Sequence, residues 1–214
     1  MSPSESCRPL IDKRRHARYK RLLDIILALA ALLILAPIML IIALIITGES
    51  PGPVIFCHSR LGLGGRLFTV YKFRTMQAGT ADPFLSLSGN QRDEFQVNFK
   101  LPDDPRVTRI GKVLRRFSLD ELPQFWNVLK NEMSIVGPRP ITPAELPRYG
   151  PDGNLLLSVK PGLTGLWQVS GRNALPYARR IQLDLDYVRQ HSLRLDLTIL
   201  LATFRAICSR KGAC

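Results

Sequence analysis

The chain has 214 residues, a net charge of +13 at pH 7 and a pI near 10.2. That length suits one compact domain with a membrane element. The charge favours anionic partners. The four cysteines have no metal-binding spacing, which excludes a cysteine-built zinc site and is compatible with a reducing cytoplasm.

The N-terminal segment, residues 1–21, concentrates positive charge directly before an apolar run. It holds seven Lys or Arg residues and two acids, a net charge of +5, while the remaining +8 is spread over the rest of the chain. A basic cluster in this position predicts attraction to anionic lipid headgroups. A nucleic-acid-binding arm is the competing interpretation, and the hydrocarbon-soluble sequence that follows argues against it.

The apolar run covers residues 25–47 and contains no charged side chain. As a helix it would measure about 34 Å, enough to cross a bilayer core of roughly 30 Å. Pro37 lies near its middle and divides it into arms of about 17 Å each, which favours a sharp bend. The pattern alone permits either a kinked transmembrane span or a re-entrant helix-break-helix that enters and leaves on one face.

Two strands are predicted after the apolar run, at residues 54–60 and 66–76, joined by a hairpin turn at LGLGG. Lys72 and Arg74 lie two residues apart and therefore share one strand face. Their side chains either line a site that binds anions or are exposed to solvent. Residues 78–90 are small and polar and predict a loop, and a helical pattern covers residues 107–116.

The most informative stretch is residues 114–140, LRRFSLDELPQFWNVLKNEMSIVGPRP. Ser118 followed three residues later by Glu121 is typical of a capping box, and Pro123 fits only near a helix start. A helix is therefore predicted from this point, with its apolar side made of Leu122, Phe125, Trp126, Leu129 and Met133.

An acid pair, Asp120-Glu121, lies at this predicted helix start between flanking arginines. A helix N-terminus attracts phosphate through its dipole and its free N–H groups. Two carboxylates there suggest a nucleophile and a metal ligand acting on a phosphate ester. The alternative is that the acids only complement the helix dipole.

The C-terminal half contains two glycine- and proline-rich segments and one helical pattern. Three prolines in residues 137–143 would hold Arg139 rigidly, and the glycines of residues 160–173 suit close approach by a nucleotide. Trp167 is predicted to pack in the core. A final helix is predicted with an apolar face that is either buried or rests on the bilayer, formed by Leu197, Leu200, Leu201, Phe204 and Ile207.

Four motifs, in order along the chain, resemble those of the bacterial sugar transferases. They are YKFRTM (71–76), DPRVTRIGK (104–112), the DE-containing segment with VGPRP, and KPGLTGLWQVSGRN (160–173). The resemblance includes the basic and then apolar N-terminus and covers most of the chain. The family comprises polyisoprenyl-phosphate hexose-1-phosphate transferases, monotopic phosphoglycosyl transferases that begin exopolysaccharide and O-antigen assembly.

This resemblance implies transfer of a hexose-1-phosphate from a UDP-sugar to undecaprenyl phosphate, with release of UMP. Asp120 would be the nucleophile and form an aspartyl phosphosugar, and Glu121 would act beside it and help to hold Mg²⁺. The stretches ELPRYG and KPGLTGLWQVSGRN are similar to exopolysaccharide-initiating members, so UDP-galactose or UDP-glucose is the expected donor. The expected substrate-binding residues are Lys72, Arg115, Arg139 and Arg172.

The resemblance also selects the re-entrant topology. It implies an α+β, mostly helical, monotopic fold with a small β-hairpin, made of a basic cytoplasmic segment (1–21), a re-entrant helix broken at Pro37 (22–47) and a cytoplasmic catalytic domain (48–214). The expected location is the cytoplasmic face of the bacterial inner membrane, with membrane lipid and no nucleic acid as partners. The sequence leaves open whether the protein forms a homodimer. The rival hypotheses are a non-catalytic basic membrane adaptor and a UDP-sugar hydrolase.

Overall fold

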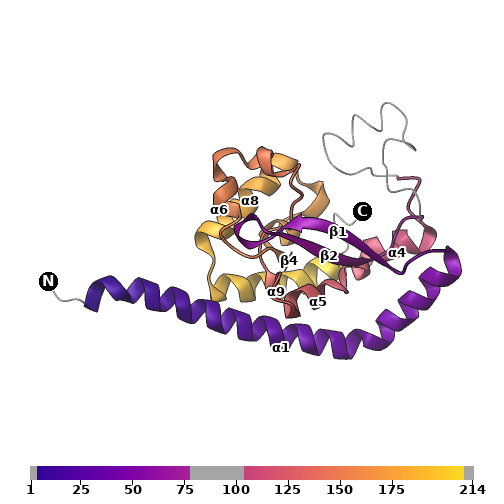
Figure 1. The fold of residues 1–214 in the computed structure, drawn as a ribbon, viewed down its shortest axis with the longest axis horizontal. Helices are drawn as coiled ribbons and strands as arrows, with labels where there is room; N and C mark the ends of the chain where they lie inside the picture. Colours follow the sequence, from indigo (N-terminus) through magenta and orange to yellow (C-terminus); the bar gives the residue numbers. More distant parts are fainter. Residues whose placement is uncertain (1–3, 78–103, 210–214) are drawn as a thin grey trace.

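One long N-terminal helix lies against a small α+β body (Figure 1). The computed structural model describes the backbone of residues 4–77 and 104–209, and the side chains of residues 17–77, 104–172 and 174–206. The loop predicted at residues 78–90 is outside the described residues. The predicted class, a mostly helical α+β fold with a small hairpin, is confirmed.

Helix α1 (Ser4–Glu49) is continuous through Pro37, so the predicted break at this residue is wrong. The helix bends in its second half, which contains Pro37 (Figure 1). Proline removes one backbone hydrogen bond and crowds the preceding turn, which bends a helix without ending it when many helical residues lie on both sides. The re-entrant topology of residues 22–47 stays a prediction.

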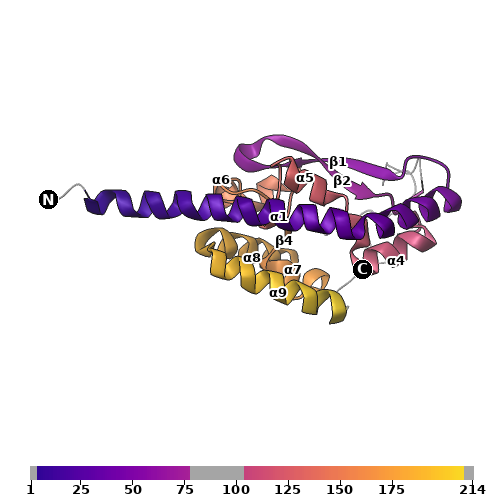
Figure 2. The same ribbon diagram turned by 90° about the horizontal axis from the view of Figure 1, so that it is seen from below.

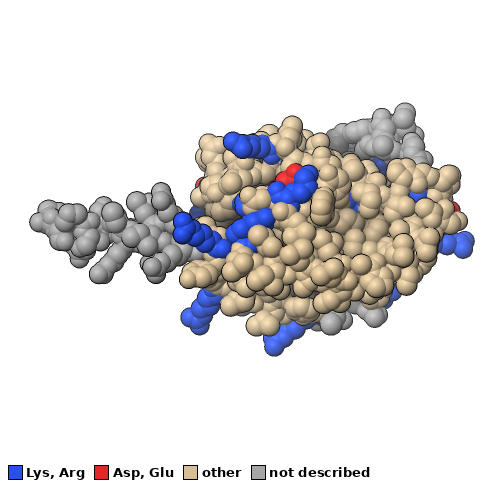
Figure 3. Space-filling model, turned by 60° about the horizontal axis from the view of Figure 1, so that its bottom comes forward, with Lys and Arg blue, Asp and Glu red and all other residues tan. Residues whose placement is uncertain are grey.

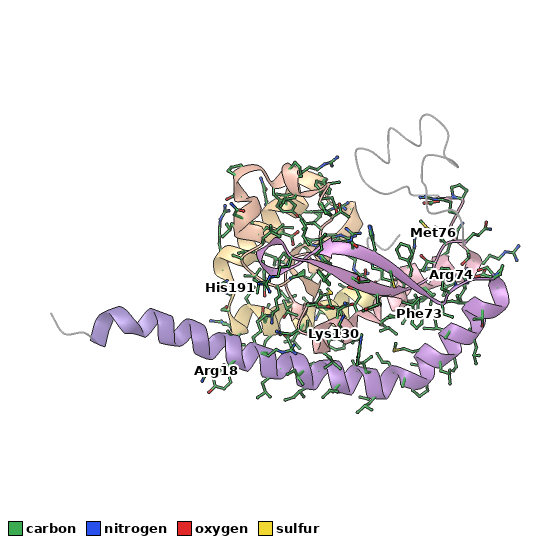
Figure 4. All side chains as sticks on the ribbon, viewed as in Figure 1. Arg18, Phe73, Arg74, Met76, Lys130 and His191 are labelled. Atoms are coloured by element: carbon green, nitrogen blue, oxygen red, sulfur yellow. The ribbon has the colours of Figure 1, made fainter. Side chains whose placement is uncertain are left out.

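Most of the apolar surface of α1 is not covered by the body. The segment Ala17–Glu49 is long and apolar enough to cross a membrane, and Leu33 and Ile34 are 75% and 73% exposed. Carbon-only side chains project from α1 away from the body (Figure 4), and few charged residues lie over this face (Figure 3). An apolar surface of this size indicates contact with a membrane or a partner.

Polar bonds fasten the start of this apolar stretch to the body. Lys20 Nζ donates to Asp196 Oδ2 at 2.7 Å. The Arg21 guanidinium donates to the carbonyl oxygens of Val128 and Leu129 at 2.6 and 2.9 Å. Both cations belong to the basic segment predicted to attract lipid headgroups, but these two side chains bond to the protein itself.

The other end of α1 rests on the same body. Ile42 and Ile46 are buried in an apolar cluster with Phe73. Glu49 Oε1 accepts a hydrogen bond from the N–H of Ile110 at 3.1 Å. The two ends of the apolar helix are therefore fixed to one body.

The predicted hairpin is confirmed as strands β1 (Ile55–Leu61) and β2 (Leu67–Phe73), which pair antiparallel around the short helix η1 (Leu63–Gly65). Arg74 follows β2 and is buried, and its guanidinium donates to the carbonyl oxygens of Ser50 and Pro51 at 2.8 and 2.7 Å. Figure 4 shows Arg74 near the end of α1. Arg74 thus fixes the connection after α1 and does not line an anionic site.

The body is built around a small apolar core that includes Val70, Val128, Met133 and Ile199. Figure 2 shows α1 between the hairpin and α5 on one side and α8 and α9 on the other. The elements after the hairpin are α4 (Arg109–Phe117), η2 (Leu119–Glu121), α5 (Gln124–Leu129), β3 (Ser134–Val136), η3 (Leu146–Asp152), α6 (Gly153–Leu156), β4 (Gly162–Thr164), α7 (Leu166–Val169), η4 (Arg172–Ala174), α8 (Tyr177–Gln190) and α9 (Leu193–Ser209).

Strands β3 and β4 pair in parallel and bring the VGPRP and KPGLTG segments together backbone to backbone. The N–H of Gly137 donates to the carbonyl of Thr164 at 2.9 Å, and the N–H of Gly162 donates to the carbonyl of Pro138 at 2.8 Å. A Cβ atom at Gly162 would overlap the backbone of Gly137. Glycine is required there because the two chains approach too closely for any side chain.

The apolar face predicted for the last helix is largely exposed, although its Leu200 is partly buried against the core. Leu197, Leu201 and Phe204 of α9 are 52%, 70% and 71% exposed, while Ile199 on the opposite side is 1% exposed and belongs to the core. The sequence left burial and bilayer contact open for this face. Its exposure within the described residues favours contact with the bilayer.

Candidate active site

The acid pair lies in a turn between two helices. Ser118 adopts a left-handed backbone (φ 57°) that ends α4, and its side chain caps nothing, so the predicted capping box is wrong. Asp120 and Glu121 belong to η2, and Pro123 precedes α5 as predicted. Helix α5 ends at Leu129 and is too short to supply the helix dipole that the sequence suggested.

Asp120 is buried, with 9% of its surface exposed. Burial raises the pKa of its carboxyl to about 6, and the neighbouring charge of Glu121 acts in the same direction, while Lys72 and Arg115 oppose the rise. At pH 7 such a group is ionised in roughly nine molecules of ten. The turn therefore holds a desolvated carboxylate with cations beside it.

Glu121 is more accessible and forms an ion pair across to the hairpin. Lys72 Nζ lies 2.6 Å from Glu121 Oε1, and the two side chains are 27% and 30% exposed. Lys72 thus lies beside both acids, and its role in substrate binding stays a prediction.

Asn127 fixes the hairpin over the acid turn, and sequence reasoning missed it. Its side-chain amide donates to the carbonyl of Thr69 at 2.6 Å and accepts from the N–H of Tyr71 at 3.2 Å. Asn127 is fully buried in α5. A buried amide that replaces backbone partners of β2 sets the position of Lys72 relative to the acids.

Arg115 approaches the acid turn from the last turn of α4. Its Nε donates to Thr75 Oγ1 at 3.0 Å, which orients the guanidinium. Its charge lowers the pKa of Asp120, so the two groups lie within electrostatic reach of each other. The structure therefore brings together Asp120, Glu121, Lys72 and Arg115.

Arg60 and Glu145 add a second group of charges that sequence reasoning missed. Arg60 Nη1 of β1 lies 2.9 Å from Glu145 Oε2, and both are largely buried. Burial lowers the pKa of Arg60 to about 10, with a further contribution from the nearby charge of Arg139. The charges of Arg60, Lys72 and Arg139 also lower the pKa of His58, which burial lowers most. All three cations therefore lie within electrostatic reach of His58 in the middle of β1.

Arg139 lies half-buried after β3. Its backbone N–H donates to Asp184 Oδ1 at 3.3 Å, and its guanidinium lies 5.7 Å from the ring centre of Trp167. Within the described residues the guanidinium has no hydrogen-bond partner. Trp167 is 4% exposed and packs between Arg139 and Arg180, which confirms its predicted core position.

Arg172 is not joined to this group by any contact among the described residues. It begins η4 with a left-handed backbone (φ 53°), directly after Gly171. A non-glycine residue in this conformation is uncommon and marks a locally constrained turn. The predicted role of Arg172 in nucleotide binding stays a prediction.

Of the two acids, only Glu121 has a carboxylate accessible to a magnesium ion that arrives with a phosphate substrate, and its Oε1 is paired with Lys72. Within the described residues no group of three or more His, Cys, Asp or Glu side chains converges as a metal site. Mg²⁺ commonly binds one or two carboxylates together with substrate phosphates and water, and does not require a dedicated cage. Glu121, with its accessible carboxylate, is the residue suited to that role.

Comparison with known proteins settles the family. The model of the bacterial sugar transferase family matches residues 15–210. The chain belongs to this family. The bacterial sugar transferase assignment agrees with the motif resemblance, and the acid turn, the hairpin and the VGPRP segment all lie within the matched residues.

Several curated relatives support the assignment. The chain is 44% identical to an undecaprenyl-phosphate galactose phosphotransferase of Salmonella typhimurium strain LT2, over 95% of this chain and 43% of that protein. It is 42% identical to the exopolysaccharide production protein ExoY of Sinorhizobium fredii, over 91% of this chain and 87% of that protein. It is 41% identical to an undecaprenyl-phosphate glucose phosphotransferase of Komagataeibacter xylinus, over 90% of this chain and 36% of that protein. The chain thus spans less than half of the two phosphotransferases.

Proposed function

We propose that this bacterial sugar transferase moves a hexose-1-phosphate from a UDP-hexose to undecaprenyl phosphate and releases UMP. The observation that carries the proposal is the buried Asp120 carboxylate, held beside the cations Lys72 and Arg115. The names of the relatives supply the lipid acceptor and favour galactose or glucose as the sugar. Exopolysaccharide initiation follows from the similarity to ExoY.

In the first step, an Asp120 oxygen attacks the phosphorus that carries the sugar. The bond from that phosphorus to the bridging oxygen breaks, and UMP leaves with the electron pair. Burial makes the Asp120 carboxylate more basic than an ordinary aspartate and strips it of water, so it attacks more readily while still being ionised at pH 7.

Fixed cations stabilise the charge that spreads over the phosphoryl oxygens. Arg139 has guanidinium donors with no partner in the described protein, and its fork can bind two phosphate oxygens. Lys72 and Arg115 lie beside the acids and hold the reacting phosphate close to Asp120. A magnesium ion bound at Glu121 would neutralise part of the diphosphate charge.

In the second step, an oxygen of undecaprenyl phosphate attacks the phosphorus of the aspartyl phosphosugar. The acyl phosphate bond breaks, Asp120 leaves as a free carboxylate, and the product is a lipid-linked diphosphate sugar. The buried position of Asp120 limits the access of water, which would otherwise hydrolyse the intermediate.

The attachment of α1 supports a site on one side of the membrane. Lys20 and Glu49 both bond to the same body. A helix that crossed a bilayer would separate these residues by roughly 30 Å of hydrocarbon, so they could not reach one cytoplasmic domain. This favours attachment to a single face of the membrane, and the water-soluble nucleotide substrate selects the cytoplasmic face of the inner membrane, where it meets the membrane-dissolved phosphate.

Isotope exchange tests the covalent route. Purified protein in detergent is mixed with UDP-galactose or UDP-glucose and labelled UMP, without lipid acceptor. We expect the label to enter the UDP-sugar. Asp120→Asn should reduce the exchange by at least about a thousandfold because the nucleophile is lost, whereas Asp186→Asn, an acid-to-amide change on α8 outside the site, should leave it unchanged.

Three outcomes would contradict parts of the proposal. UMP release that requires the lipid, without any exchange, would indicate direct transfer. Free sugar phosphate formed without lipid would indicate a hydrolase. An Asp120→Asn protein with parental activity would remove the assigned nucleophile.

A further inference from the structure

A group of polar residues on α1 lies outside the site and contacts both segments that flank it. Lys20, Arg21 and Asp24 occupy about one helical turn, directly before the apolar stretch. Asp24 is 5% exposed, and the Lys20 side chain is 20% exposed. Charged residues with so little exposure in an otherwise apolar helix need a specific reason.

Arg21 holds the C-terminal end of the helix that follows the acid turn. Its two terminal nitrogens donate to the carbonyl oxygens of Val128 and Leu129 at 2.6 and 2.9 Å. These carbonyls belong to the last residues of α5; the carbonyl of Val128 also accepts from the N–H of Asn131 at 3.0 Å, and Arg21 adds a bond to it from outside the helix. Because α5 is a single short rigid element behind Pro123, fixing its end also fixes the acid turn at its start.

Asp24 and Lys20 hold the strand that leads to Arg139. Asp24 Oδ1 accepts from the N–H of Ile135 at 2.9 Å and from Ser134 Oγ at 3.0 Å. Lys20 Nζ donates to the carbonyl of Val136 at 2.9 Å. Together these bonds hold all three residues of β3, and Arg139 follows three residues later.

The last helix closes the group. Asp196 of α9 accepts from Lys20 Nζ at 2.7 Å through one carboxylate oxygen and lies 2.7 Å from the hydroxyl of Tyr187 through the other. Two cations and two carboxylates balance one another, so the group has no charge left for a substrate. A fully satisfied polar network in the interior specifies one arrangement of its elements.

From these contacts we propose that Lys20, Arg21 and Asp24 are positioning residues of the transferase. They fix the acid turn through α5 and Arg139 through β3, and so set the separation of the nucleophile and the phosphate-binding arginine. Because the same helix turn begins the apolar stretch, the docking of the membrane helix determines the geometry of the site. The test of this inference by UMP release rests on the proposed function. The test by hydrogen exchange depends on the structure alone.

The first test measures the rate of UMP release in a single turnover, in detergent and without lipid acceptor, for Arg21→Met. We expect the rate constant to fall at least about tenfold, because small displacements of reacting groups are costly. The amplitude, which counts competent molecules, should stay at the parental value. Arg21→Lys keeps the positive charge and one nitrogen that can donate to the carbonyls of Val128 and Leu129, so it should recover part of the rate.

Two matched variants separate positioning from charge and from folding. Arg18→Met removes the same charge from an exposed side chain that has no hydrogen bond or ion pair among the described residues, and Arg194→Met does so on α9. Both should keep the parental rate constant. Lys20→Met combined with Asp196→Asn removes both charges of the buried pair together, and this double variant should also slow the reaction without loss of amplitude.

Hydrogen exchange supplies the readout that does not depend on activity. Amides in residues 118–139 should exchange faster in Arg21→Met, whereas those of α8 should not change. Unchanged exchange in residues 118–139, a fall in amplitude at a parental rate constant, or equal slowing by Arg18→Met would overturn the inference. If the parental protein releases no UMP while the exchange pattern appears, the proposed function fails and the structural coupling stands.

Discussion

The active site and the α1 attachment both gather charge, but they use it in opposite ways. At the attachment, Lys20 and Arg21 are balanced by Asp24 and Asp196, and each side chain bonds to backbone or to an opposite charge. At the site, Arg60 and Lys72 form ion pairs with Glu145 and Glu121, but the Arg139 guanidinium has no hydrogen-bond partner in the described protein. Paired charge indicates an architectural role, whereas the unpaired Arg139 guanidinium indicates a place for an anionic substrate.

The largest effect that would test this contrast is on stability. Lys20→Met leaves the Asp196 carboxylate buried without its cation, and removing one partner of a buried pair costs about 3–5 kcal/mol. We expect the free energy of unfolding to fall by about that amount in chemical denaturation. The double variant Lys20→Met/Asp196→Asn should recover much of the loss, and a single variant as stable as the parent would show that the pair is not balanced charge.

An effect of intermediate size, on substrate binding, is expected at the unpaired Arg139. Arg139→Met should raise the KM for the UDP-sugar by about 10- to 100-fold, because hydrogen bonds to charged groups contribute about 1.5–3 kcal/mol. Its stability should change little, since the guanidinium bonds to no described residue. Steady-state kinetics of UMP release measure this, with Arg179→Met on the exposed side of α8 as the charge-matched control.

Arg172→Met provides a comparison with Arg139→Met, because both arginines were predicted to bind substrate. The resemblance assigns Arg172 to nucleotide binding, yet it has no contact with the other cations among the described residues. We expect a smaller rise in the KM for the UDP-sugar than in Arg139→Met, and little change in the KM for lipid. A larger effect at Arg172 would place the phosphate-binding surface farther from the hairpin.

The smallest effect is a pH dependence of stability at Asp184. Burial raises the pKa of this carboxyl from 3.8 to about 7, although bonds from Arg139 and Tyr149 oppose the rise. The folded state therefore binds the proton more tightly, so this group stabilises the protein most at low pH and loses that contribution as the pH rises toward 7. Between pH 5 and pH 8 the parental Tm should fall by a few degrees relative to Asp184→Asn. If the Tm of the parent and the Tm of Asp184→Asn changed with pH in the same way, the raised pKa of Asp184 would be refuted.

Local patterns in the sequence predicted the local elements well. The hairpin, the helix before the acid turn and the core position of Trp167 follow from alternation, turn residues and periodicity. The capping box failed because a left-handed Ser118 ends α4 just before the acids, and backbone conformation at one residue is not encoded in spacing. The break at Pro37 failed because proline bends a long helix more readily than it ends it.

The parts of the structure that the sequence did not predict are ion pairs between residues far apart along the chain. Arg60 and Glu145 are 85 residues apart in sequence, and Lys20 and Asp196 are 176 apart. Neither pair leaves a periodic signal, and each partner taken alone is consistent with an ordinary surface charge. The family resemblance named the acids and the arginines, but only the folded arrangement shows which cations converge and which are already paired.

The close contact of β3 with β4 affects how mutational surveys of this enzyme should be read. At Gly162 even one methyl group would push the KPGLTG segment off the VGPRP segment and carry Arg139 with it. An alanine scan would therefore score this glycine as if it were a catalytic position. The lost activity would come from a displaced main chain, and a compensating change in the facing segment, not a chemical substitute, is the kind of second mutation that could restore it.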